Sequence, residues 1–92
     1  MYLEVVSPEA ILFQGEVESV AVPGVNGAFH ILNNHAPIVS VLGKGNVTIY
    51  GNVSLEEKFQ DKFTTTANGN TALGIDSGVV EMRDNKLVVL VD

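Results

Sequence analysis

The chain has 92 residues, of which 46% are hydrophobic and 17% are charged, and its net charge is −6 at pH 7. This composition permits a buried core, and the length fits one small domain over residues 1–92. Five lysine and arginine residues and no cysteine exclude a basic nucleic-acid surface, a polybasic membrane patch, a disulfide framework and a thiol nucleophile.

The start of the chain predicts extended structure. Residues 2–6 form a first predicted strand. Residues 10–22 are long for one strand and contain Gly15, which predicts a bulge or bend that lets one segment serve two sheets. The parity of the apolar side chains also changes along this segment, and a bulge near residues 18–19 would absorb the change.

Residues 22–37 are the most distinctive part of the chain. They read VPGVNGAFHILNNHAP, in which a valine-rich strand ends at Pro23-Gly24 and a short strand over 28–32 leads into a turn. Gly24 and Gly27 predict a turn with positive φ at one or both glycines. The segment holds no nucleophile, metal cage or phosphate loop, and it therefore indicates a rigid, shaped surface for a partner.

The middle of the chain predicts two further strands and one ambiguous region. Residues 38–42 and 46–50 are predicted strands that a glycine-containing turn joins. Residues 51–70 fit two helical turns behind a capping box that starts at Ser54, and their apolar residues also fit one face of a strand. We favour strand and loop, because a short isolated helix is weakly stable.

The last third of the chain completes an all-β pattern. A turn at residues 68–70 precedes predicted strands at 71–75, 78–82 and 87–91, with a hairpin turn at Asp84-Asn85. Short strands at this spacing, without helices between them, predict a β-sandwich or flattened barrel of two sheets.

The two histidines do not predict a catalytic or metal site. A catalytic zinc usually takes three protein ligands, and no acidic residue lies between Glu18 and Glu56 to join His30 and His35. We expect His30 on a surface turn and His35 as a hydrogen-bonded packing residue. Ser40 follows His35, but no third group orients the imidazole, so no triad is predicted. We therefore expect no catalytic residue, metal, cofactor or small-molecule substrate.

Four motifs follow one another along the chain. They are LEVVSPE with LFQGEVESV near the start, VPG-x-x-G-x-F-x-IL-x-x-HAP over residues 22–37, L-x-x-G-x-V over residues 42–47, and SGVVEM with N-x-LVVLVD at the end. In this order they resemble the epsilon subunit of rotary (F-type) ATP synthase. The chain departs from that pattern at His30, where the family usually has glycine, at Asn33-Asn34, where Pro-Gly is common, and over residues 51–70.

The resemblance implies a ten-stranded β-sandwich in a non-catalytic rotor subunit of a proton-translocating ATP synthase. Such a subunit couples the gamma subunit to the membrane c-ring at the cytoplasmic face of the bacterial inner membrane. The glycines would set the backbone of the contact loop, Phe29 and Ile31 would anchor it, and His35 and Pro37 would shape its edge. The resemblance thus implies contacts with gamma and the c-ring at Gly24, Gly27, Ala28, Phe29, His30, Ile31, Asn34, His35 and Pro37.

Other interpretations stay open from the residues alone. A free-standing β-sandwich that binds a small ligand or a carbohydrate predicts an aromatic-lined pocket, yet the chain has four Phe, two Tyr and no Trp. A lipoyl-type carrier predicts a modified Lys62 beside Asp61.

Family members typically continue into a C-terminal helical hairpin associated with ATP sensing and inhibition. This sequence ends at Asp92, where that hairpin would begin, so we expect neither activity here. No leader and no run of about 20 apolar residues is present, which predicts an interior aqueous compartment without membrane insertion.

Overall fold

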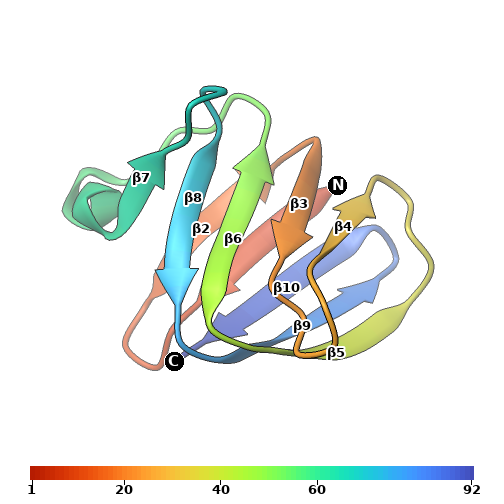
Figure 1. Ribbon diagram of the computed structural model, residues 1–92. Coiled ribbons are helices and arrows are strands. Elements are labelled where there is room, and N and C mark those ends of the chain that lie inside the picture. The colour runs from red at the N-terminus through yellow and green to blue at the C-terminus, as the bar shows by residue number, and fades with distance from the viewer.

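The chain forms two five-stranded sheets packed face to face, as Figure 1 shows for the computed structural model, which describes residues 1–92. The first sheet has the strand order β2-β1-β10-β9-β5, and the second sheet has the order β4-β3-β6-β8-β7. The predicted all-β fold of two sheets is confirmed. The elements are β1 (Tyr2–Val6), β2 (Ile11–Glu16), β3 (Ser19–Val22), β4 (Phe29–Leu32), β5 (Ile38–Leu42), β6 (Gly45–Tyr50), a 3-10 helix η1 (Glu57–Lys62), β7 (Phe63–Thr65), β8 (Thr71–Ile75), β9 (Gly78–Arg83) and β10 (Lys86–Val91).

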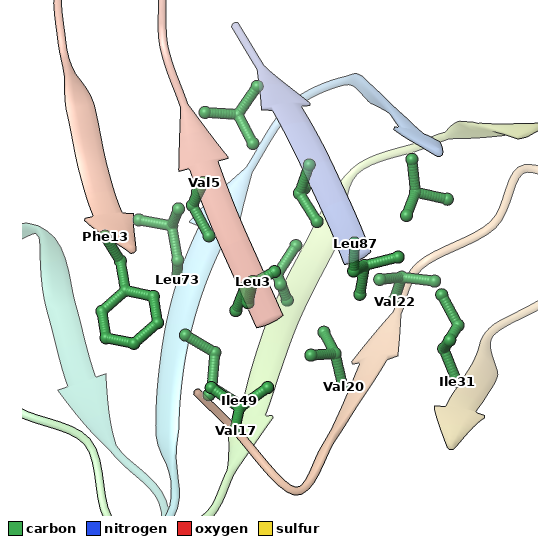
Figure 2. Packing of buried hydrophobic residues seen from close by; sticks show 14 of the residues in the cluster. Leu3, Val5, Phe13, Val17, Val20, Val22, Ile31, Ile49, Leu73 and Leu87 are labelled. Carbon is green, nitrogen blue, oxygen red and sulfur yellow. The ribbon is translucent and has the colours of Figure 1, made fainter. Parts of the chain in front are cut away.

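The hydrophobic core lies between the two sheets. Successive side chains of a strand point to opposite faces, so alternate apolar residues of each sheet point inward and meet in the middle. Figure 2 shows labelled members of this core gathered between the strands. The least exposed are Leu3, Val5, Val80, Leu87 and Val89 from the first sheet, and Val20, Ile31, Val47 and Ile49 from the second. The residues of opposite parity face outward on both sheets.

The prediction that one early segment serves two sheets is confirmed, and the break lies at residues 17–18, next to the bulge predicted near residues 18–19 and not at Gly15. β2 belongs to the first sheet and β3 to the second, and they are separated by Val17 and Glu18. The amide of Val17 donates to the carbonyl of Met1 over 2.9 Å, and the amide of Glu18 donates to the carbonyl of Tyr50 over 2.9 Å. The chain therefore changes sheets here, which reverses the inward direction and explains the change of parity.

The predicted bulge at Gly15 is wrong. Gly15 pairs with Leu3 inside a regular ladder, and the register shift falls instead between Val5 and Val6, where Leu12 is left over in β2. A Cβ on Gly15 would lie 3.3 Å from the Phe13 ring, so this glycine makes room for the buried phenyl group beside it.

Residues 51–70 combine the two structures that the sequence allowed. A short strand does form at β7, but the preceding residues form η1 rather than a strand, so the preferred strand prediction is only partly right. The capping box at Ser54 does not form, because the N-cap residue is Glu56 and it makes no side-chain cap hydrogen bond. Tertiary packing decides this region: Phe63 is buried, and Leu55 and Phe59 pack partly against the core.

Candidate docking surface

The nine residues predicted to contact a partner all lie on one side of the sandwich. β4 is the outermost strand of the second sheet, and β5 is the outermost strand of the first. The chain before β4 and the chain between β4 and β5 run along this side, as Figure 1 shows. We call residues 23–37 the docking edge. It connects the two sheets rather than extending from one of them.

The first part of the docking edge is held against β5 by backbone hydrogen bonds. The carbonyl of Pro23 accepts from the amide of Gly43 over 2.7 Å, and the amide of Val25 donates to the carbonyl of Val41 over 3.0 Å. Gly24 forms an isolated bridge with Leu42. These bonds pair part of the free edge of β5 and fix the loop to the first sheet.

The two glycines of this loop serve different purposes. Gly27 has a φ of 127°, which confirms the prediction of positive φ at one or both positions. Gly24 is needed for space, because a Cβ there would lie 2.6 Å from the carbonyl oxygen of Gly27 and 2.9 Å from the Phe29 ring. The amide of Gly27 also donates to the carbonyl of Gly24 over 2.9 Å and closes the turn.

The residues in and just before β4 divide into buried anchors and exposed surface residues. Ile31 is fully buried and Phe29 packs partly against the core, so both anchor the strand, and Ile31 lies beneath the surface rather than on it. Ala28 and His30 are exposed.

The expected roles of the two histidines are only partly right: His30 is exposed as expected but lies in a strand and not in a turn, and His35 is hydrogen-bonded as expected but only half-buried. His30 lies in β4, where its Nε2 is 2.8 Å from the Ser19 hydroxyl and its ring centroid is 4.6 Å from that of Tyr50. His35 lies in the turn after β4, and its Nδ1 is 2.7 Å from the carbonyl oxygen of the adjacent Ala36. The reason is alternation: because Ile31 points inward, His30 points outward over the neighbouring strands. Sequence analysis missed Ser19 and Tyr50, whose proximity depends on the pairing register.

The turn at Asn33-Asn34 is joined to the β9–β10 hairpin. Asn34 has a φ of 63°, and Asp84 and Asn85 have φ of 52° and 59°, which fits the predicted hairpin turn. The side-chain oxygen of Asn85 accepts from the Asn34 amide over 2.8 Å, and its amide group donates to the Asn33 side-chain oxygen over 2.9 Å. The docking edge is therefore fixed to the first sheet at both of its ends.

We expect Asn85→Gly to loosen the 33–34 turn without breaking the hairpin. Glycine accepts the positive φ of this position, so the hairpin turn can still form. The substitution removes both side-chain hydrogen bonds, and each contributes about 0.5–1.5 kcal/mol to stability. The measurement is amide hydrogen exchange at Asn34, which should become faster in the variant. In Asn85→Asp, which keeps the acceptor oxygen, the Asn34 amide should stay protected. Equal exchange in all three proteins would contradict the role assigned to Asn85.

The structure offers no enclosed site for a ligand. Its largest hollow, about 590 Å³, is open to solvent and has Phe63 as its only aromatic lining residue. No group of three or more His, Cys, Asp or Glu side chains is placed to share a metal ion. None of its helices has the length and apolar character needed to cross a membrane. The aromatic-lined pocket that a carbohydrate-binding module requires is not formed.

Two packed five-stranded sheets define a small β-sandwich domain, and its candidate site is a braced outer edge and not a pocket. The model of the ATP synthase delta/epsilon chain β-sandwich domain matches residues 1–92, and the chain belongs to this family. The resemblance seen in the sequence motifs is thus confirmed.

Known relatives agree with this assignment. An ATP synthase epsilon chain of Leptospira interrogans is 39% identical over 90 residues, which are 98% of this chain and 59% of the relative. An epsilon chain of Chlorobium limicola is 34% identical over 90 residues, which are 98% of this chain and 86% of the relative. A chain in the central stalk and c-ring structure of the Tetrahymena thermophila mitochondrial ATP synthase has the same fold, with a TM-score of 0.72 at 14% identity over 98% of this chain and 61% of that chain.

Proposed function

We propose that the chain is a non-catalytic central-stalk subunit of a rotary ATP synthase, and that it joins the gamma subunit to the membrane c-ring. Membership of the delta/epsilon family supports this proposal, as does the fold shared with a chain from a central stalk and c-ring assembly. The protein would then lie at the cytoplasmic face of a bacterial inner membrane as a peripheral part of the complex.

The observation that carries the proposal is the bracing of the docking edge. A part that transmits torque must keep its contact surface fixed relative to its body. Hydrogen bonds tie the start of this edge to β5 through Pro23 and Val25, and tie its end to the β9–β10 hairpin through Asn85. Phe29 and Ile31 anchor the middle in or against the core. Such an edge can bind another protein without an ordering cost in the loop.

Binding to purified partners tests this function. The chain is mixed with the gamma subunit and with detergent-solubilised c-ring of the same organism, and complexes are separated by size-exclusion chromatography. We expect a stoichiometric complex with gamma and retention on the ring. Ala28→Arg, which adds a bulky charge to an exposed position of the docking edge, should weaken at least one of these contacts by about tenfold, as loss of an interface hot spot does.

The control variant is Thr64→Arg, which adds the same side chain to the exposed face of β7 at the opposite end of the second sheet. It should bind as the unmodified chain does. If the unmodified chain binds neither gamma nor the ring, the proposed function is wrong. If Ala28→Arg and Thr64→Arg both bind normally, the function stands but the docking edge is not the contact.

A further inference from the structure

Two turns of the chain are built alike, and each contains an Asn-Gly pair. Asn26-Gly27 lies in the docking edge, and Asn68-Gly69 lies in the loop between β7 and β8. In both turns the glycine amide donates to the carbonyl oxygen three residues earlier over 2.9 Å, and the glycine has positive φ. All four residues are exposed, and a Cβ on either glycine would meet no atom within 4 Å. The two turns therefore differ chiefly in how the rest of the chain holds them.

An asparagine followed by glycine is prone to a spontaneous modification, and asparagine is among the thermolabile residues for this reason. The backbone nitrogen of the glycine attacks the side-chain carbonyl carbon of the asparagine, and a nitrogen–carbon bond forms. The side-chain nitrogen takes up the proton that the glycine nitrogen loses and leaves as ammonia, which gives a cyclic succinimide. Water then opens the ring at one of its two carbonyl carbons and produces aspartate or isoaspartate. Glycine favours the attack because it has no side chain to crowd it and is conformationally permissive.

The hydrogen bond of the glycine amide protects each turn from this reaction. The attacking nitrogen must be free of its carbonyl acceptor, and the asparagine side chain must fold over it. The turn must therefore open locally before it reacts, and the rate follows the free energy of that opening. Because the protecting hydrogen bonds have the same length in both turns, their surroundings decide which asparagine reacts.

The turn in the docking edge is held by contacts outside itself. The carbonyl of Pro23 accepts from the amide of Gly43 over 2.7 Å, and the amide of Val25 donates to the carbonyl of Val41 over 3.0 Å. Phe29, which follows the turn closely, packs partly against the core. Opening this turn requires that contacts with the first sheet be broken as well.

The turn between β7 and β8 is held only by its own residues and by the two strands that it joins. The amide of Thr66 donates to the carbonyl of Asn70 over 2.7 Å, and the amide of Asn70 donates to the Thr66 hydroxyl over 3.1 Å. β7 has three residues and is the outermost strand of its sheet, so it pairs on one side only. Exposed segments at a sheet edge, with few buried contacts, open most readily.

We propose that Asn68 is a site of spontaneous deamidation and isomerisation in the folded chain, and that the contacts of the docking edge protect Asn26 from the same reaction. The inference does not depend on the proposed function. β7 and β4 are the opposite outermost strands of the second sheet, as Figure 1 shows, so the Asn68 turn stays accessible when a partner covers the docking edge.

Each product changes the turn in its own way. Aspartate adds one negative charge to a chain whose net charge is already −6. Isoaspartate also adds a methylene group to the main chain, which disturbs the hydrogen bonds between Thr66 and Asn70 that close the loop. The docking edge keeps its contacts in both cases, because the modified turn lies at the other end of the sheet.

Peptide mapping tests the proposal on the purified, folded chain during incubation in a mildly alkaline buffer. Trypsin separates the two sites, because Lys44, Lys58 and Lys62 lie between them, and mass spectrometry then locates the conversion of asparagine to aspartate. An isoaspartate-specific carboxyl methyltransferase detects the isomerised product. We expect Asn68 to react at least about tenfold faster than Asn26. Asn70 is the internal control and should react slowly, because the side chain of the following residue, Thr71, crowds the attacking nitrogen.

The same measurement in concentrated urea separates the effect of structure from that of sequence. Both sites are Asn-Gly pairs, so their rates should become similar once the chain is unfolded. If Asn26 reacts as fast as Asn68 in the folded chain, or if Asn68 reacts no faster than Asn70, the proposal is overturned. A difference between Asn26 and Asn68 that persists in urea overturns the protective role of the docking-edge contacts.

Two variants extend the test, and thermal unfolding shows whether each is folded. Gly24→Ala strains the turn of the docking edge, so the rate at Asn26 should rise relative to that at Asn68 in the same protein. Asn68→Gln should abolish the modification of the β7–β8 loop and leave the rate at Asn26 unchanged, because glutamine must close a larger ring. A folded Gly24→Ala protein with no acceleration at Asn26 contradicts the protection inferred for the docking edge. The comparison in urea uses no variant and decides the question if Gly24→Ala does not fold.

Discussion

Leu87→Ala is expected to lower the free energy of unfolding by about 2–5 kcal/mol, which is the cost of removing a buried leucine and leaving a cavity. Leu87 has no exposed surface and lies in β10, the central strand of the first sheet. It pairs with Leu3 of β1 and with Met82 of β9, both of which are buried. The space left by the missing side chain is therefore bounded by rigid strands and cannot readily collapse.

This loss is large for a chain of 92 residues, because small domains are stabilised by only about 5–15 kcal/mol in total. Urea unfolding measures it: the midpoint should fall while the slope with denaturant stays the same. Leu90→Ala is the control, since Leu90 lies in the same strand but faces outward and is 49% exposed. Its cost should stay below about 1 kcal/mol. Equal losses at both positions would contradict the described orientation of β10.

Strand alternation made most of the fold predictable from the sequence. β1, β5 and β8 have the predicted limits, and the limits of β4, β6, β9 and β10 differ from the prediction by one residue. The Asp84-Asn85 turn was also predictable, because these residues tolerate the positive φ that a tight hairpin needs. Such signals are local, and each lies within a few residues of the structure that it specifies.

Features that depend on pairing between distant segments could not be predicted. Ile11, Val6, Leu90, Val79 and Val41 form one apolar row across the outer face of the first sheet, and only the registers of four strand pairs bring them into line. The sequence shows that residues 87–91 are nearly all apolar, so both faces of this strand carry apolar side chains. The sequence of one strand does not show whether another part of the protein covers its outer face. His30 was misplaced for the same reason, since its partners Ser19 and Tyr50 lie on other strands.

The nine residues expected to contact a partner remain a prediction, and the structure adds where each of them lies in the fold. All nine expected residues lie on one side of the sandwich, because they come from a single continuous segment. Their division into surface and support required the structure: Ile31 proves to be fully buried, while Ala28 and His30 face solvent. The bracing contact from Asn85 is more than 50 residues away along the chain, and no pattern within residues 22–37 indicates it.

Gly24→Ala is expected to destabilise the protein by about 1–3 kcal/mol, the usual cost of forcing extra atoms into a packed site, and to weaken binding to gamma or the ring. The added methyl group would lie 2.6 Å from the carbonyl oxygen of Gly27, so the backbone of the loop must move. That movement would strain the hydrogen bond from Val25 to Val41, which holds the docking edge against β5. Stability and docking should therefore fall together.

The matched control is Gly74→Ala in β8, where the new Cβ would meet only the side-chain oxygen of Asn46, at 3.6 Å. That variant should keep or slightly raise its stability, because glycine in a strand costs about 0.5–1 kcal/mol relative to alanine. Thermal unfolding and retention on gamma and the c-ring measure both effects. A Gly24→Ala protein that is destabilised yet binds normally would place the contact away from the loop. One that is unchanged in both respects would contradict the packing of Gly24 against Gly27. We expect Gly24→Ala to lose both stability and binding. The substitution removes no side chain, so its effect would come from the changed backbone of the loop.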